Sequence, residues 1–238
     1  MPMVGVCDLL GFSNLVLSGD LTEIVENHLG YLRKVLYHSI HQHDFPEEPP
    51  SLSELLDQDR VGFAWFSDTI LLYGQDDSEE SNRHVIETIG WLISEAMLVP
   101  QVRIRAGVSF GPMYIDSENG IFVGPALVEA YRLEKKQLWS GGALSSSASE
   151  NMLPRDPWLI EYDVPIRGEH DERTTMRTLA INWTSIMHFP NTFLLDWLID
   201  QPEPSQEEID RNPDIVEKWR NTRQFHIDVC SSCNLQKV

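Results

Sequence analysis

Residues 3 to 13 read MVGVCDLLGFS, an apolar run that carries one carboxylate, Asp8, and breaks at Gly11 and Phe12. The run predicts a buried strand, and an acid inside a buried strand has a desolvation cost that a partner must offset. A satisfied core aspartate and a helix N-cap are structural explanations, but a cap would lie near Ser13. A cation held by Asp8, beside a helix that opens after Phe12, is the better explanation, and this arrangement suits a metal-bound phosphate.

A second acid occurs in a similar setting. Residues 61 to 74 read VGFAWFSDTILLYG, two apolar runs interrupted at Ser67 and Asp68. This pattern predicts a hairpin with a carboxylate at its tip. Two lone aspartates, each at the end of an apolar strand, are suited to binding two divalent ions jointly.

Four motifs, taken in order, resemble those of class III nucleotidyl cyclases. DLLGFS at 8 to 13 resembles the family's first metal motif, D-[IL]-x-G-F-[ST], and FSD at 66 to 68 resembles the second. IRAGVSFGPM at 104 to 113 resembles the R-x-G-[IV]-x-x-G strand and turn. IFVGPALVEAYRLE at 121 to 134 resembles the G-x-x-[VL]-x-x-A-x-R-[LM] helix. Each motif alone is unspecific, whereas all four in this order are a fairly strong signal.

The resemblance implies an α/β (α+β) fold class: a ferredoxin-like class III nucleotidyl cyclase domain with a mostly antiparallel sheet and helices on one face. We assign residues 1–163 to this catalytic domain, with 43–59 as an exposed insertion rich in proline and acid. Residues 164–238 are expected to form a C-terminal strand and helix extension packed on the domain or dimer. Periodicity and breakers predict helices over 14–41, 82–98 and 192–199, and one that begins at Pro125 and closes at Gly141 and Gly142.

Composition and charge favour a soluble cytoplasmic protein. The net charge of −19 argues against nucleic acid or an anionic membrane as the main partner, because both would repel the chain. No stretch resembles a signal peptide, and no window reaches the length of a membrane span. Cys7, Cys230 and Cys233 form a sparse, odd set that fits a reducing compartment. The C-x-x-C spacing of the last two is a weak zinc or redox signal.

For the metal site, the resemblance implies that Asp8 and Asp68 bind two divalent ions, Mn or Mg, and that the Leu9 carbonyl adds a ligand to one of them. It further implies that the amides of the turn after this strand bind the triphosphate of a nucleotide; the turn consists of Leu10, Gly11, Phe12 and Ser13. Such a two-ion site serves phosphoryl transfer, because one ion activates the attacking hydroxyl while the other holds the leaving phosphates.

Two arginines match family positions. Arg132 matches the arginine that offsets charge developing at the phosphoryl centre. Its alternative is a helix-surface arginine paired with Glu129 or Glu134. Arg105 matches a strand position and is a nucleotide-binding candidate, with a buried ion pair as its alternative.

The resemblance also implies a homodimer, because in this family the metal carboxylates face the base-reading and arginine groups across two catalytic domains. Two-fold symmetry would then give two composite sites. Three positions depart from the family pattern. Val128 replaces the ribose-positioning asparagine, which leaves Glu129 as a candidate, and Ala64 and Ile121 replace the purine-reading pair.

These departures favour a cyclase that is active on a base other than adenine or guanine, because Asp8, Asp68 and Arg132 are intact while the base readers are lost. The chain looks most similar to the uridylate and cytidylate cyclases of bacterial Pycsar antiphage systems, and this resemblance implies a pyrimidine nucleotide cyclase. We expect UTP to be converted to cyclic UMP and pyrophosphate by attack of the 3'-OH on the α-phosphate, with the product read by a separate cyclic-nucleotide-binding effector. Three alternatives stay open: a cytidylate cyclase, an adenylyl or guanylyl cyclase, and an inactive nucleotide-binding regulatory dimer.

A pyrimidine is smaller than a purine, so a pocket that selects it needs bulk at its far end. Side chains in or beside the expected hairpin are candidates for this bulk, namely Phe63, Trp65, Tyr73 and Ile121.

Overall fold

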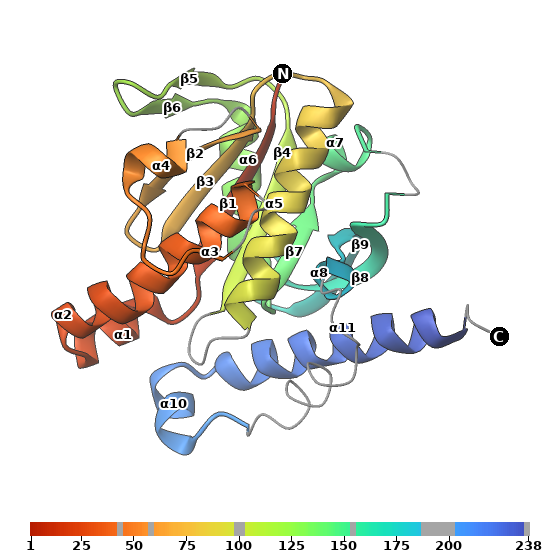
Figure 1. Cartoon of the computed structure of the whole chain (residues 1–238). Coiled ribbons are helices and arrows are strands. Elements are labelled where there is room, and N and C mark those ends of the chain that lie inside the picture. The colour runs from red at the N-terminus through yellow and green to blue at the C-terminus, as the bar shows by residue number, and fades with distance from the viewer. Residues whose placement is uncertain (42–44, 57–59, 98–102, 153–155, 187–202, 236–238) are drawn as a thin grey trace.

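The computed structural model covers the whole chain and describes residues 1–41, 45–56, 60–97, 103–152, 156–186 and 203–235. Its centre is a seven-stranded sheet in the order β2-β3-β1-β4-β7-β9-β8 (Figure 1). The strands of this sheet are β1 (Met3–Leu9), β2 (Val61–Phe66), β3 (Thr69–Gly74), β4 (Ile104–Phe110), β7 (Gly141–Leu144), β8 (Leu159–Arg167) and β9 (Arg173–Ile181). A separate two-stranded sheet consists of β5 (Tyr114–Asp116) and β6 (Ile121–Val123).

The sheet is mostly antiparallel, which confirms the predicted fold class. Strand β1 lies between β3 and β4 and is antiparallel to both. Only the neighbours β4 and β7 run parallel within the described sheet. The longest apolar run of the N-terminal region therefore forms an inner strand, as its composition predicts.

Helices surround this sheet along the whole chain. They are α1 (Phe12–Ser18), α2 (Leu21–Glu23), the π-helix η1 (Ile24–Leu29), α3 (Gly30–His41), α4 (Leu52–Leu56), α5 (Glu79–Met97), α6 (Pro125–Lys136), α7 (Ser146–Ser149), α8 (Trp183–Ile186), α10 (Gln206–Arg211) and α11 (Ile215–Leu235). No helix in the described ranges is both long enough and apolar enough to cross a membrane.

Helices cover both faces of the sheet, so the expectation of helices on one face is wrong in this detail (Figure 1). A Cβ on Gly5 of β1 would lie 2.4 Å from the Ile89 side chain of α5. A Cβ on Gly107 of β4 would lie 2.2 Å from the Ala130 carbonyl oxygen of α6. Successive side chains of a strand point to opposite faces, and both sets are apolar in β1 because each face is covered.

Two predicted helix boundaries differ from the structure. The single helix expected over 14–41 is interrupted, because the Asp20 side chain accepts hydrogen bonds from the Thr22 and Glu23 amides at 2.8 and 3.1 Å and starts a new helix. Gly141 and Gly142 belong to β7 and do not close α6, which ends at Lys136. Gly142 fits this strand because a Cβ there would lie 2.7 Å from Ile181.

The C-terminal segments complete the fold. The boundary proposed at residue 163 falls inside β8, and β9 continues the same sheet. Helix α11 packs Phe225 edge-on against Trp139 at a centroid distance of 4.8 Å, and Tyr162 of β8 stacks on Trp139 at 5.7 Å. The helix expected over 192–199 and the side chains of Cys230 and Cys233 lie outside the described part.

Candidate active site

Asp8 lies near the end of β1 on the face covered by α6. It shares this face with Val4 and Val6, which pack against Ala126 and Ala130 of that helix. On its two sides Asp8 is in register with Thr69 of β3 and with Arg105 of β4. The sheet therefore delivers a basic residue directly beside the first predicted metal ligand.

Asp68 lies next to the same strand end. Ser67 and Asp68 form the turn between β2 and β3, and Ser67 has a left-handed φ of 55°. The Leu9 amide donates to the Asp68 carbonyl at 2.9 Å. This backbone bond fixes the hairpin tip against the end of β1, so the two carboxylates predicted to act together belong to adjacent chain segments.

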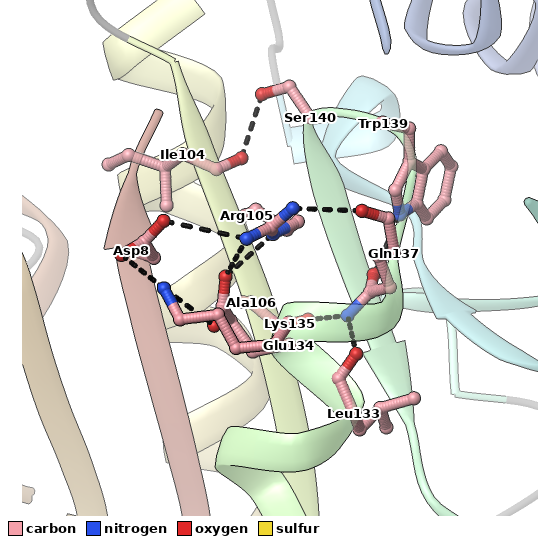
Figure 2. A network of polar contacts seen from close by, with 10 residues as sticks. All are labelled: Asp8, Ile104, Arg105, Ala106, Leu133, Glu134, Lys135, Gln137, Trp139 and Ser140. Atoms are coloured by element: carbon pink, nitrogen blue, oxygen red, sulfur yellow. Dashed lines mark hydrogen bonds and ion pairs between the residues drawn. The ribbon is translucent and has the colours of Figure 1, made fainter. Parts of the chain in front are cut away.

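A buried ion-pair network surrounds Asp8 (Figure 2). The Lys135 ammonium lies 3.1 Å from Asp8 Oδ1, and Arg105 Nη2 lies 3.6 Å from Asp8 Oδ2. Arg105 Nε donates to Glu134 Oε1 at 2.6 Å, and its Nη1 donates to the Gln137 carbonyl at 2.9 Å. Two acids and two bases thus neutralise one another at the centre of the site.

Burial sets the electrostatics of this network. Desolvation raises the pKa of Glu134, nearby Asp8 raises it further, and Arg105 opposes both effects. For Lys135, burial lowers the pKa, but Glu134 and Asp8 outweigh that effect and the net shift is upward. Glu134 therefore depends on Arg105 and Lys135 to remain charged, and the two carboxylates in turn favour the charged form of Lys135.

The network contains the residues that sequence reasoning missed. Sequence motifs indicate Glu134 only as a partner for Arg132, and no motif includes Lys135 or Gln137. The structure shows Arg105 in the buried ion pair that was its alternative interpretation, with 7% of its side chain exposed. The signal available in the sequence for the network is an acid followed directly by a base, Glu134 and Lys135, at the end of an amphipathic helix.

Arg132 lies on the exposed side of α6. Both acids proposed as its partners are engaged elsewhere, since Glu129 accepts from Ser147 Oγ at 2.8 Å and Glu134 binds Arg105. Within the part of the chain that the structure describes, no acid forms an ion pair with Arg132.

The residues around Asp8 fit a divalent cation. Carboxylate oxygens are the ligands that Mg and Mn prefer, and the Asp8 carboxylate already holds two cationic groups at 3.1 and 3.6 Å. No three His, Cys, Asp or Glu side chains gather as a metal cluster among the described residues. Asp8 and Asp68 would therefore hold ions together with backbone oxygen, such as the predicted Leu9 carbonyl, and substrate phosphates.

The turn predicted to bind phosphate lies directly after β1. The Leu10 amide donates to the Arg103 carbonyl at 2.8 Å, so it is engaged within the protein. Gly11 precedes α1 with a left-handed φ of 84°, a conformation that glycine adopts without a steric penalty. Phe12 and Ser13 are the first residues of α1. These three amides remain the candidates for the triphosphate.

The positions predicted to contact the nucleoside are distributed over three elements. Ala64 of β2 packs on the α6 face of the sheet, whereas Ile121 of β6 and Val128 of α6 are exposed. Phe63 is buried in the core cluster on the opposite face, and Trp65 packs against the same cluster. These two aromatics therefore do not supply bulk beside Asp8, because β2 turns alternate side chains to opposite faces.

Tyr73 lies on the α6 face, with the Phe122 ring at a centroid distance of 5.8 Å. Of the four bulky side chains proposed for the base pocket, Tyr73 packs on this face, and Ile121 is exposed on β6.

No family model and no curated protein matches the chain. Solved structures are similar to it in fold. The catalytic core of a rhodopsin-guanylyl cyclase with converted specificity, in complex with ATPαS, matches with a TM-score of 0.54 at 13% identity, over 76% of this chain and 94% of that chain. The non-canonical dimeric guanylyl cyclase domain of the RhoGC fusion protein from Blastocladiella emersonii gives 0.51 at 14% identity, over 76% and 95%.

The guanylyl cyclase Cya2 gives a TM-score of 0.50 at 11% identity, over 75% of this chain and 91% of that chain. Identities this low establish a likeness of fold. That likeness spans nearly the whole of each cyclase domain and about three quarters of this chain. The chain therefore has the fold of a nucleotidyl cyclase catalytic domain.

Proposed function

We propose that this protein is a nucleotidyl cyclase that closes the ribose 3'-OH of a nucleoside triphosphate onto its α-phosphate and releases pyrophosphate. One observation carries the proposal: on a cyclase fold, the end of β1 places Asp8 beside the hairpin tip that bears Asp68. These are the two acids that the sequence motifs single out. A fold alone does not define an activity, whereas a pair of carboxylates at this position provides the chemistry.

The chain's own residues have distinct tasks in this reaction. Asp8 and Asp68 would hold two divalent ions, which activate the attacking hydroxyl and neutralise the leaving phosphates. The amides of Gly11, Phe12 and Ser13 would orient the triphosphate at the start of α1. Arg105 keeps Asp8 and Glu134 in place through its ion pairs with both carboxylates. The new bond forms between the 3' oxygen and the α-phosphorus, the hydroxyl proton passes to solvent, and the bond between the α-phosphorus and the oxygen that bridges to the β-phosphate breaks to release pyrophosphate.

We further propose that the site is completed by a second copy of the chain. Exposed apolar side chains occur on the hairpin tip, on the β5–β6 arm and on α6; they are Phe66, Tyr114, Ile121, Val123, Val128 and Tyr131. Arg132 follows Tyr131 on α6, is exposed, and forms no ion pair with an acid of its own chain in the described ranges. An arginine that faces a partner across a two-fold axis would enter the partner's site.

Dimerisation is expected to depend on these exposed apolar side chains. Val123→Glu introduces a charge at a position with 62% exposure in the β5–β6 arm and should convert a dimer to a monomer at micromolar concentration. Sedimentation velocity measures the change. Thr175→Glu, an exposed position on β9 at the other side of the sheet, is the matched control and should remain dimeric. A monomeric wild-type protein that retains full activity would contradict the composite site.

We propose UTP as the substrate, with CTP second. The support is that Ala64 and Ile121 replace the purine-reading pair and that Val128 replaces the ribose-positioning asparagine. Base preference varies on this fold, since one of the similar structures is a guanylyl cyclase of converted specificity. A pocket that pairs polar groups with one pyrimidine edge rejects the other pyrimidine by leaving those groups unpaired.

Incubation with ATP, GTP, CTP and UTP at equal concentration, each present with manganese, tests activity and base preference together. We expect pyrophosphate release and a dominant cyclic UMP peak on chromatography. A dominant cyclic AMP or cyclic GMP peak would contradict the pyrimidine assignment. Absence of any cyclic product with all four nucleotides would leave a nucleotide-binding regulatory dimer as the function.

The role we propose is synthesis of a second messenger in antiphage defence, read by a separate cyclic-nucleotide-binding effector. The support is the similarity of the altered base positions to those of Pycsar cyclases. Challenge of cells expressing the protein and its effector with phage, beside cells expressing the Asp8→Asn variant, checks this role. Equal survival of both cultures would contradict it.

A further inference from the structure

We infer that the Lys135 ammonium competes with a metal ion for the Asp8 carboxylate. When a divalent cation binds Asp8, Lys135 moves onto Glu134. This inference deepens the proposed function and rests on the metal site assigned there. Its basis is the ion pair of 3.1 Å between the Lys135 ammonium and Asp8 Oδ1 (Figure 2). An ammonium in contact with a carboxylate oxygen occupies the space that a cation needs.

Of the two cations that pair with Asp8, Lys135 is the more mobile, although its ammonium also lies 3.5 Å from Glu134 Oε2 and 5.6 Å from the centre of the Tyr131 ring. Arg105 has 7% of its side chain exposed and is fixed by the Glu134 carboxylate and the Gln137 carbonyl. The Lys135 side chain is 45% exposed, lies in the last turn of α6 and has four rotatable carbon bonds. A metal arriving at Asp8 therefore displaces Lys135 and leaves Arg105 in place.

The structure also provides a destination for the displaced ammonium. Glu134 Oε2 is buried, accepts no hydrogen bond among the described residues, and lies 3.5 Å from Lys135 Nζ. A buried carboxylate oxygen without a hydrogen bond is costly, so a closer approach of the ammonium stabilises it. The Lys135 ammonium thus lies close to two carboxylate oxygens, Asp8 Oδ1 and Glu134 Oε2. When a metal ion takes Asp8, the ammonium can move closer to Glu134.

This competition has a consequence for the order of binding. With Lys135 on Asp8, the carboxylate is neutralised and a metal ion must displace a charged partner before it binds. A nucleoside triphosphate brings phosphate oxygens as additional ligands, which compensate for that displacement. The protein without nucleotide should therefore bind divalent ions weakly, and the ions should enter mainly together with the substrate.

Titration of nucleotide-free protein with Mn²⁺, with free Mn²⁺ measured by electron paramagnetic resonance, tests the inference. Lys135→Met should tighten Mn²⁺ binding by about fivefold or more, the value of a partly exposed ion pair near 1 kcal/mol. Lys136→Met is the matched control, because it removes the same charge from the next, exposed residue of α6 and should leave the affinity within about twofold. Lys135→Arg retains the charge and should bind Mn²⁺ as weakly as wild type.

Equal Mn²⁺ affinities of wild type, Lys135→Met and Lys136→Met would overturn the inference, as would equal tightening in both methionine variants. Asp8→Asn separates this failure from failure of the proposed function. If Asp8→Asn loses Mn²⁺ while Lys135→Met matches wild type, the metal site stands and the role of Lys135 is wrong. If Asp8→Asn binds Mn²⁺ like wild type, the metal site itself is wrong. Thermal melts of each variant identify any that do not fold; if Lys135→Met does not fold, Lys135→Gln, which also removes the charge, replaces it and should show the same tightening.

Discussion

Asp8→Asn is expected to lower turnover by at least about a thousandfold, because a metal-assisted step draws several kcal/mol of transition-state stabilisation from the ions that this carboxylate holds. The substitution keeps the shape of the side chain and removes its charge. Pyrophosphate release at saturating nucleotide and manganese measures the effect. Asp163→Asn is the control, since Asp163 is an exposed acid of β8 that pairs with Arg177, and it should retain wild-type turnover.

The Asp8→Asn protein should still fold. Arg105 keeps Glu134 and the Gln137 carbonyl, and Lys135 keeps Glu134, so no buried cation is left without a partner. We expect a loss of about 2 kcal/mol in the free energy of unfolding, the range for a hydrogen bond to a charged group. Urea unfolding followed by circular dichroism measures it. Turnover retained in a folded Asp8→Asn protein would exclude Asp8 as a metal ligand.

Arg132→Ala is expected to lower kcat about a hundredfold or more and to change nucleotide affinity little, if the guanidinium acts on charge that develops in the transition state. The exposed place of Arg132 on α6 predicts in addition that it acts in the partner's site. An equal mixture of Arg132→Ala and Asp68→Ala chains should then recover about a quarter of wild-type activity, since half of the dimers are mixed and each has one intact site.

The control for this mixing experiment is a mixture of Asp8→Asn with Asp68→Ala chains. Both substitutions lie on the metal side of the site, so every composite site in that mixture contains a damaged half and activity should stay low. Absence of recovery in the Arg132 mixture, with exchange of subunits demonstrated, would show that Arg132 and Asp68 serve the same chain's site. A loss of affinity at unchanged kcat would make Arg132 a binding residue.

Local patterns in the sequence were sufficient to predict much of this site. Asp8 stood out because an acid interrupts an apolar run, and Asp68 because it divides two such runs. Pro125 marked the start of α6, which the structure confirms. Each of these signals is contained in fewer than about twenty residues, so each depends on propensities and periodicity that a single sequence displays.

The ion-pair network could not be predicted in the same way. Lys135 and Asp8 are separated by 127 positions in the chain, and their contact depends on the placement of α6 against β1. The covering of both sheet faces likewise depends on where α6 crosses the sheet. A local pattern does not show which helix covers which face of the sheet, because the side chains on both faces of the strand are apolar.

The packing of α11 has a consequence for how the chain folds during synthesis. Trp139 is fully buried, and Phe225 of α11 covers it edge-on. The Ser140 amide donates to Thr222 of the same helix at 2.7 Å, across 82 positions. A nascent chain that has released β1 to β9 from the ribosome but not α11 therefore exposes an aromatic surface, and contacts of such long sequence separation form late. The fold should consequently reach its native state only after α11 has left the ribosome, and until then the chain should be a client for chaperones that bind exposed aromatic surface.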